Sequence, residues 1–286
     1  MFRLLSRLPM AFLYAIADTI IYPLLFYILR YRRKIVRKNL TSSFPEKSIR
    51  EIKHIERQFY HWLCDYFFET LKLLTISQKE LKRRYQIFNI PQVEECLNNG
   101  QDVTIIFGHY CNWEWLSTSK SYFAPQFTVA FAYKPLHNKT LDKLFIEIRN
   151  QQGGTSVPKD LILRYISRYR SQQVRHIFGL NIDQTPKWEN IHLWLPFLNH
   201  DTPVFTGAER IIRKYNNAVF FAETVRPKRG YYNTTCQLIT TQPQQLPEHE
   251  ITKIFFQKLE QLIKQQPAYY LWTHNRWKRT RDKVTE

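Results

Sequence analysis

The residue types that can do chemistry gather in one short segment, residues 103–115, which reads VTIIFGHYCNWEW. Its apolar run VTIIF predicts a buried strand, which Gly108 ends, and His109 follows at the turn. Glu114 comes five positions later, in an aromatic segment that we expect to be a helix. Because ligand crevices of open α/β folds lie at the carboxyl ends of strands, this order places an imidazole and a carboxylate at such a crevice.

A histidine and a carboxylate in this order can act together in acyl transfer. The imidazole of His109 removes the proton from an attacking hydroxyl, while the carboxylate of Glu114 fixes the ring tautomer and stabilises the imidazolium that forms. No serine or cysteine lies in a nucleophile-elbow motif, and the nearest thiol, Cys111, has no companion motif, so a covalent acyl-enzyme is not indicated. No second histidine at helical spacing completes a zinc site, so we predict no metal. By itself the pair is a weak signal, because one such spacing arises easily by chance.

The charge of the chain points to anionic partners. Its 286 residues include 42 Lys and Arg against 24 Asp and Glu, a formal net charge of +18, and 44% of the residues are hydrophobic and can form a core. This excess fits nucleic acid, an acidic protein, phosphorylated lipid or a membrane surface. The basic residues are spread over every segment without a recognition motif, so nucleic acid is not an expected partner. No dinucleotide or phosphate-loop signature is present, so we predict no cofactor.

The N-terminal segment narrows these anionic partners. Residues 8–29 read LPMAFLYAIADTIIYPLLFYIL, with one charge, at Asp18, and prolines at positions 9 and 23. At about 1.5 Å per residue this segment is long enough to cross a bilayer core. The basic run RYRRKIVRK follows it at residues 30–38. We do not expect a cleavable signal peptide, because there is no small-x-small cleavage site and the basic run lies on the wrong side.

Three interpretations of this segment stay open: a spanning helix, a bent helix in the membrane interface with the basic run on anionic headgroups, or a core helix of a soluble domain. Asp18, Pro23 and the positive charge on both sides favour the interfacial helix. We therefore expect residues 1–40 to form a hydrophobic membrane-anchoring helix with its basic segment. Residues 41–286 are expected to form a single α/β domain.

The rest of the chain reads first as helical and then as an alternation of strands and helices. Between residues 46 and 74, apolar and aromatic residues recur at helical spacing and predict a long helix that faces the core. The expected strands after residue 100 are 103–107, 127–133, 174–182, 218–225 and 232–240. The expected helices are 112–123, 138–150, 159–170, 208–215 and 248–265. This order predicts an α/β fold with a mainly parallel sheet flanked by helices.

The segment GHYCNWEW resembles the signature block of the bacterial lipid A late acyltransferases, the lauroyl and myristoyl transferases of lipopolysaccharide synthesis. The Gly-His-x-x-Asn-Trp-Glu block of that family carries a His/Glu dyad, which falls here on His109 and Glu114. Further segments are similar to blocks of the family and come in the same order. They are KNLTSSFP, Arg149 before Gly153 and Gly154, NIDQTP with Asp183 and Gln184, LWLPFLNHDTPVFTGAERI, and PAYYLWTHNRWK near the C-terminus.

This resemblance implies a glycerolipid acyltransferase-like fold within the lysophospholipid acyltransferase-like superfamily. It also implies transfer of a fatty acyl chain, usually from acyl carrier protein, to a hydroxyl of a lipid A precursor. The reaction would take place at the cytoplasmic face of the bacterial inner membrane. Acyl carrier protein is acidic and lipid A precursors carry phosphates, so both would be drawn to a chain of charge +18.

The resemblance further implies His109 as general base with Glu114 as its partner. It implies substrate-binding roles for Asn112, Arg149, Asp183 and Gln184. Arg149 has three possible roles: it stabilises an oxyanion, holds a phosphate, or only forms a salt bridge with Asp183. The block after Gln184 departs from the family pattern and leaves the acceptor and the chain length open. The alternatives are another hydroxylated lipid acceptor, such as an aminolipid or lysophospholipid, and a non-catalytic membrane-surface protein.

Overall fold

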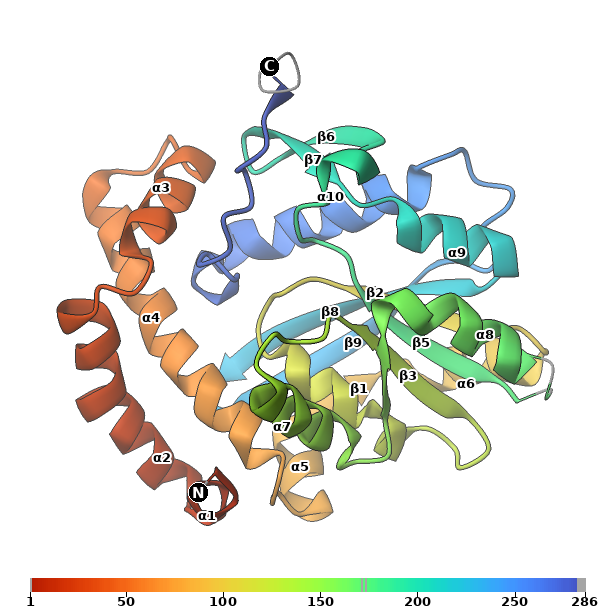
Figure 1. Ribbon diagram of the computed structural model, residues 1–286, viewed down its shortest axis with the longest axis horizontal. Helices are drawn as coiled ribbons and strands as arrows, with labels where there is room; N and C mark the ends of the chain where they lie inside the picture. The colour runs from red at the N-terminus through yellow and green to blue at the C-terminus, as the bar shows by residue number, and fades with distance from the viewer. Residues whose placement is uncertain (1, 171, 173, 282–286) are drawn as a thin grey trace.

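The computed structural model describes residues 2–170, 172 and 174–281, and a seven-stranded sheet lies at its centre (Figure 1). The strand order is β1-β9-β8-β2-β5-β3-β4, and every neighbouring pair is parallel except β8 and β9. The predicted α/β class with a mainly parallel sheet is confirmed. The strands of this sheet are β1 (Tyr85–Phe88), β2 (Val103–Phe107), β3 (Thr128–Tyr133), β4 (Thr155–Pro158), β5 (His176–Asn181), β8 (Ala218–Lys228) and β9 (Tyr231–Thr240).

Helices cover both faces of this sheet. Figure 1 shows α10 above the sheet and α5 below it, while α4 and α2 run side by side at one edge of the molecule. The α-helices are α1 (Phe2–Arg7), α2 (Met10–Ile16), α3 (Arg33–Ser43), α4 (Ile49–Lys72), α5 (Gln78–Arg84), α6 (Ile90–Asn98), α7 (Lys139–Asn150), α8 (Ile162–Arg170), α9 (Gly207–Tyr215) and α10 (Glu250–Gln265). The shorter π and 3₁₀ helices are η1 (Ala17–Ile21), η2 (Leu24–Ile28), η3 (Trp113–Tyr122), η4 (Lys159–Leu161), η5 (Trp188–Asn190) and η6 (Pro267–Tyr269).

The central strand β2 and the long helix α4 both form where their sequence patterns predict them. β2 is buried at all five positions, as expected of an apolar strand with parallel neighbours on both sides. α4 begins with a capping box, in which the Ser48 hydroxyl accepts a hydrogen bond from the backbone N–H of Glu51 and the Glu51 carboxylate accepts one from the backbone N–H of Ser48. It buries one aromatic face, including Phe59, Trp62 and Phe68.

Other elements differ from the expectation. Residues 113–122 form the 3₁₀ helix η3 in place of an α-helix. The chain also contains an antiparallel hairpin that the sequence pattern did not indicate, made of β6 (Leu193–Phe197) and β7 (His200–Val204). Leu198 and Asn199 connect its strands, and both have left-handed backbone angles, φ 51° and 61°. These are the angles of a two-residue hairpin turn, but the usual Asn-Gly or Asp-Gly signal is missing.

The N-terminal segment is attached to the rest of the protein along its length. The expected boundary between residues 1–40 and residues 41–286 falls inside α3, which continues to Ser43. The side-chain amide of Asn39 in α3 donates hydrogen bonds to the backbone oxygens of Trp272 and His274, at 2.9 Å each. α3 therefore joins the C-terminal segment of the chain as well as α4.

Candidate active site

His109 lies at the carboxyl end of β2, in a turn that a second segment of the chain holds in place. The backbone N–H of Leu271 donates to the carbonyl oxygen of His109 at 3.1 Å, and the N–H of Cys111 donates to that of Tyr269 at 2.9 Å. Gly108 allows α10 to approach, because a Cβ there would lie 2.7 Å from Leu259. The glycine, the turn and the C-terminal segment together fix where the imidazole stands.

The imidazole of His109 is bound by Asp183, which follows β5, the neighbour of β2 in the sheet. Oδ1 of Asp183 lies 2.5 Å from Nδ1 of the ring, and Oδ2 accepts the backbone N–H of His109 at 3.0 Å. An ionised carboxylate can only accept, so Nδ1 carries the hydrogen and Nε2 is the basic nitrogen. The side-chain amide of the exposed Gln184 contacts this nitrogen, with its Nε2 atom at 3.1 Å.

Asp183 stays ionised although it is only 2% exposed. Burial alone raises the pKa of its carboxyl group, but the charge and hydrogen bonds of His109, together with the charge of Arg276, lower that pKa below its ordinary 3.8. Arg276 is itself 1% exposed, and its Nη2 donates to the backbone oxygen of Pro203 at 2.8 Å. Asp183 therefore has the protonation state and the geometry to orient an imidazole.

Glu114 is not the hydrogen-bonded partner of His109, which corrects the pairing expected from the sequence. Its two carboxylate oxygens accept hydrogen bonds from Nη2 and Nε of Arg149, at 2.7 Å each, and Tyr66 approaches at 3.4 Å. Burial raises the pKa of the Glu114 carboxyl, but Arg149, and to a smaller extent the charge of His109, lower it below 4.5. The 3₁₀ helix η3 explains the difference, since it directs Glu114 toward α7 and leaves Nδ1 of the ring to Asp183.

The ion pair of Arg149 also differs from the expectation, because its partner is Glu114 and not Asp183. The guanidinium lies over the rings of Phe145 and Tyr133, with centroids at 5.3 and 5.7 Å, and its side chain is 21% exposed. The pair with Glu114 uses Nε and Nη2, which leaves Nη1 outside it. Arg149 is thus held in a fixed orientation, and Nη1 is not used by its pair with Glu114.

Asn112, for which the resemblance implies a substrate-binding role, is placed inside the protein. Its side chain is 1% exposed, and its amide nitrogen donates to Oε2 of Glu69 in α4 at 2.9 Å. The indole of Trp115 donates to the backbone oxygen of the same Glu69 at 3.2 Å. These residues of the signature segment therefore attach the loop after His109 to α4.

Cys111 is fully buried, and burial raises the pKa of its thiol, so it is not placed as a nucleophile. Its φ of 52° is in the left-handed region, which is uncommon for a residue with a Cβ and turns the chain between His109 and η3. Trp113 then stands edge-on to His109, with 5.0 Å between the ring centroids. Within the described part of the chain, no group of three or more His, Cys, Asp or Glu side chains is arranged for a metal ion.

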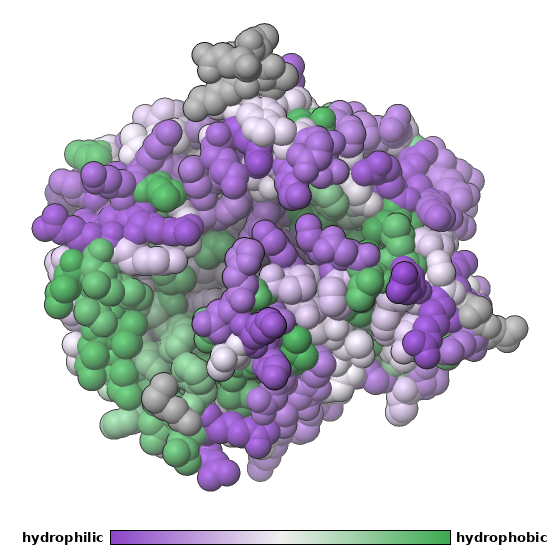
Figure 2. All heavy atoms as spheres, in the orientation of Figure 1, coloured by the Kyte–Doolittle hydropathy of each residue, from purple (hydrophilic) through white to green (hydrophobic). Residues whose placement is uncertain are grey.

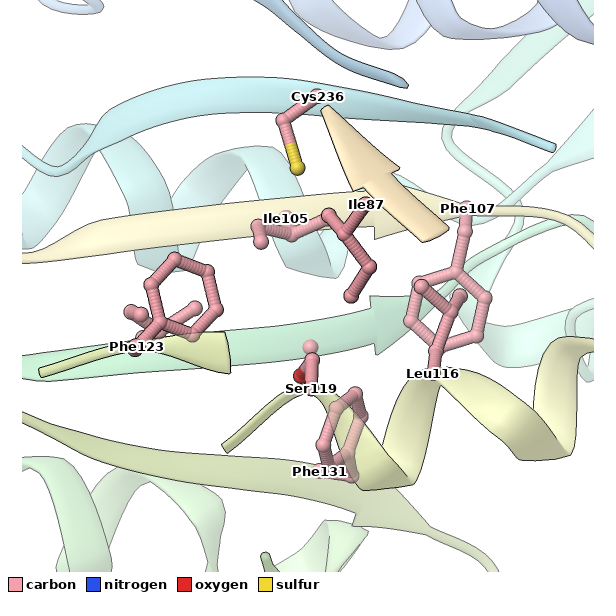
Figure 3. A pocket seen from close by; sticks show the side chains of 10 residues that line it. Ile87, Ile105, Phe107, Leu116, Ser119, Phe123, Phe131 and Cys236 are labelled. Atoms are coloured by element: carbon pink, nitrogen blue, oxygen red, sulfur yellow. The ribbon is translucent and has the colours of Figure 1, made fainter. Parts of the chain in front are cut away.

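A small apolar cavity lies between η3 and the sheet (Figure 3). Phe107, two residues before His109, forms one end of it beside Leu116. Phe131 packs against Gly179, where a Cβ would meet its ring at 2.2 Å. The free space is about 10 Å³, which is room for about one water molecule. The remaining lining residues are Ile87, Ile105, Ser119, Phe123, Ile177 and Cys236.

Sequence reasoning missed the contribution of individual residues of the C-terminal segment. His274 accepts a hydrogen bond from the backbone N–H of Thr185 at 3.3 Å, and the Thr185 hydroxyl donates to the backbone oxygen of Arg276 at 2.6 Å. Both contacts hold the loop that follows Asp183. The sequence block THNRWK carries His274 and Arg276 and could have indicated them. Its spacing does not show, however, that an arginine so distant in the chain lies beside Asp183.

Comparison with known proteins assigns the chain to a family. No curated protein matches it. The family model described as bacterial lipid A biosynthesis acyltransferase matches residues 1–279, almost the whole chain. The match includes the His109 turn, the Asp183 loop and the C-terminal segment that holds both. The chain therefore belongs to the bacterial lipid A biosynthesis acyltransferase family.

Proposed function

We propose that this protein transfers a fatty acyl chain from acyl carrier protein to a hydroxyl of a lipid A precursor, with His109 as the general base. Family membership supports an acyltransferase that acts on lipids. The observation that carries the proposal is the orientation of His109: Nδ1 is bound to Asp183, and Nε2 is the basic nitrogen at the accessible side of the ring.

In the proposed reaction the acceptor hydroxyl takes the place of the Gln184 amide at Nε2 of His109. The hydroxyl oxygen attacks the thioester carbonyl carbon while its proton moves to Nε2. The tetrahedral intermediate then collapses, the C–S bond breaks, and the leaving thiolate takes the proton from the imidazolium. The products are the acylated lipid and the free thiol of the carrier, and the ring returns to its starting state.

We assign the orienting role to Asp183, in place of Glu114. Its contacts to Nδ1 and to the backbone N–H of His109 match what an orienting carboxylate does in acyl transfer. Glu114 holds Arg149, whose remaining N–H groups then stabilise the oxyanion of the tetrahedral intermediate or bind a phosphate of the lipid. A charge-assisted donor held by a buried carboxylate suits either role, because its position is fixed before the substrate arrives.

The donor and the location are part of the same proposal. A chain of net charge +18 attracts both an acidic carrier protein and a phosphorylated lipid, and we place the reaction at the cytoplasmic face of the inner membrane. The small cavity beside Phe107 is proposed to receive part of the acyl chain once side chains such as Leu116 rotate. Another hydroxylated lipid as acceptor, or a protein without catalytic activity, is the alternative outcome of the test.

The experiment compares the lipid A of cells that express the wild-type chain, the His109→Ala variant or no protein. Mass spectrometry should detect one additional secondary acyl chain with the wild type alone, and its mass gives the chain length. The same membranes, incubated with acyl carrier protein or coenzyme A thioesters, identify the donor. Equal acylation by wild type and His109→Ala would overturn the role of His109, and acylation of a different lipid would replace the acceptor.

A further inference from the structure

The N-terminal helical segment Met10–Ile28, made of α2, η1 and η2, is long and apolar enough to cross a bilayer, and it is the one such segment in the described part of the chain. Only 22% of its most apolar 18-residue stretch is buried inside the protein. Length and composition do not distinguish a spanning helix from one that lies in the membrane interface. The contacts on its two faces make that distinction.

The inner face of this segment packs against the catalytic part of the protein. Leu13, Ala17 and Phe26 are buried, and Tyr22 stacks on His61 of α4 with the ring centroids 3.7 Å apart. α2 runs alongside α4 in Figure 1, and α1, η1 and η2 contact the same helix. The segment therefore follows the surface of the protein and does not project from it.

Polar contacts hold the segment at several points. The Tyr14 hydroxyl donates to Oε1 of Glu69 at 2.9 Å. Asp18 forms a two-point ion pair with Arg229, at 2.7 and 2.9 Å, and Arg229 also binds Asp65 of α4. These charged and polar partners belong to α4 and to the turn between β8 and β9.

Both ends of the segment are held in the same way. The ammonium group of Lys72 donates to the backbone oxygens of Ser6 and Leu8, at 2.9 and 2.8 Å. At the other end, Nη1 of Arg33 donates to the backbone oxygen of Phe26 at 3.3 Å. Neither end is free to swing away from α4 without breaking contacts to a charged side chain.

The outer face is an apolar surface that no other element of the described residues covers. Figure 2 shows apolar residues gathered over α2, with a hydrophilic band over α3 next to them. We call this surface the lipid-facing stripe. It consists of Phe12 (53% exposed), Ile20 (57%), Leu24 (38%), Tyr27 (58%), Ile28 (72%) and Leu29 (59%).

The stripe ends at a basic surface. Arg30 and Arg32 have left-handed backbone angles, φ 46° and 52°, so the chain turns sharply there and enters α3. Exposed basic side chains lie in this turn, on α3 and in the first turns of α4. They are Arg30, Arg32, Lys34, Lys38, Arg50, Lys53 and Arg57. An apolar stripe bordered by cations fits the acyl chains and anionic headgroups of one leaflet.

We propose that Met10–Ile28 lies in the plane of a single leaflet and does not cross the bilayer. In a spanning orientation, α4 with Asp65 and the Asp18–Arg229 pair would enter the hydrocarbon, which is strongly unfavourable for charged groups. In the plane of the leaflet, the stripe enters the acyl region and the basic surface meets anionic headgroups. This inference deepens the proposed membrane location and rests on it, but it does not depend on the chemistry of His109.

Topology labelling tests the proposal directly. Arg7→Cys and Lys34→Cys place one exposed thiol on either side of the segment, and the four natural cysteines are buried. In intact spheroplasts and in inverted membrane vesicles, a membrane-impermeant maleimide should label both positions from the same side, the side of the catalytic domain. Labelling from opposite sides would overturn the proposal. The readout is independent of acyl transfer, so it separates this failure from a failure of the proposed reaction.

Vesicle binding tests the two surfaces. Ile28→Glu should weaken sedimentation with phosphatidylglycerol vesicles by about tenfold or more, because it removes an apolar contact and adds a charge. Leu163→Glu is the matched control, since Leu163 is 46% exposed on α8, outside the stripe. Wild type should bind phosphatidylcholine vesicles more weakly than anionic ones. Equal binding of the Ile28→Glu and Leu163→Glu variants, with both folded by circular dichroism, would refute the assignment of the stripe.

Discussion

Replacing Asp183 with asparagine tests the central feature of the proposed mechanism, the orientation of the imidazole. The carboxylate of Asp183 accepts two hydrogen bonds, one from Nδ1 of His109 and one from the backbone N–H of the same residue. The backbone group can only donate, so an asparagine must present its oxygen there. Its NH₂ group then faces Nδ1, which forces the hydrogen of the ring onto Nε2. In that tautomer the nitrogen facing the acceptor hydroxyl cannot remove a proton.

We expect kcat of Asp183→Asn to fall by about 100- to 10,000-fold, or about 3 to 5 kcal/mol of transition-state stabilisation, the range for loss of a general base or its tautomer. KM should change little, because Asp183 is 2% exposed and does not line the surface that substrates reach. The assay is initial-rate transfer from a labelled acyl carrier protein thioester to the lipid acceptor in detergent, with the acceptor varied.

Asp102→Asn is a matched control for this substitution. Asp102 is also 2% exposed and also accepts a backbone N–H, that of His176 at 3.0 Å, but it precedes β2 at the opposite edge of the sheet. It should lower stability and leave kcat per folded molecule nearly unchanged. If Asp183→Asn keeps more than about a tenth of the wild-type kcat, the assignment is wrong. Loss of activity in a folded Glu114→Gln variant does not bear on this assignment, because Glu114 also holds Arg149.

Three further predictions follow from the site and its surroundings. Glu114→Gln breaks the buried pair with Arg149 and should lower the free energy of unfolding by about 3 kcal/mol in denaturant titrations. Glu147→Gln removes an exposed pair between Arg3 and α7, the helix that carries Arg149, and should change that free energy by less than about 1 kcal/mol. Burial lowers the pKa of His274 from 6.5 to about 4, so between these pH values only the unfolded chain binds the proton. The free energy of unfolding should therefore decrease as the pH falls through this window, by up to about 3 kcal/mol, and His274→Gln should flatten that decrease. Leu116→Ala enlarges the apolar cavity and should shift donor preference toward longer acyl chains by about fourfold per added methylene, measured in competition between thioesters; an unchanged preference would place the acyl chain elsewhere.

The sequence predicts the helices and strands whose apolar residues recur at a regular spacing. It misses those that depend on tertiary contacts. β2 and α4 lie where their apolar patterns place them, because burial on both faces or on one face dictates their residues. β4 is four residues long and too short for any period to be visible. The segment after Asn112 has helix-forming residues, yet it forms a 3₁₀ helix because Trp115 and Asn112 bind Glu69 and fix how the chain leaves the His109 turn.

The sequence names several residues that the structure brings together, but it does not show which of them pair. Sequence order places His109 and Glu114 on one segment and therefore suggests them as partners. Asp183 is 74 positions away, and only the sheet order, with β5 beside β2, brings it to the same edge. The pairing of Glu114 with Arg149 has the same origin, because α7 returns over η3. Residues far apart in the sequence cannot be paired from their spacing, because the order of the strands and the packing of the helices determine which of them meet.

The buried charge of Arg276 shows why the C-terminal segment belongs to the site. A guanidinium that is 1% exposed is strongly unfavourable unless an anion compensates it. Asp183 supplies that anion, and His109 and Arg276 in turn lower the pKa of its carboxyl group and keep it ionised. His109, Asp183 and Arg276 therefore form alternating charges whenever the imidazole takes up a proton. In the proposed reaction, the carboxylate of Asp183 stabilises the imidazolium that forms when His109 takes up the proton of the acceptor hydroxyl. In the proposed reaction, Arg276 acts through Asp183, and the last block of the sequence thereby supports the orientation of the imidazole.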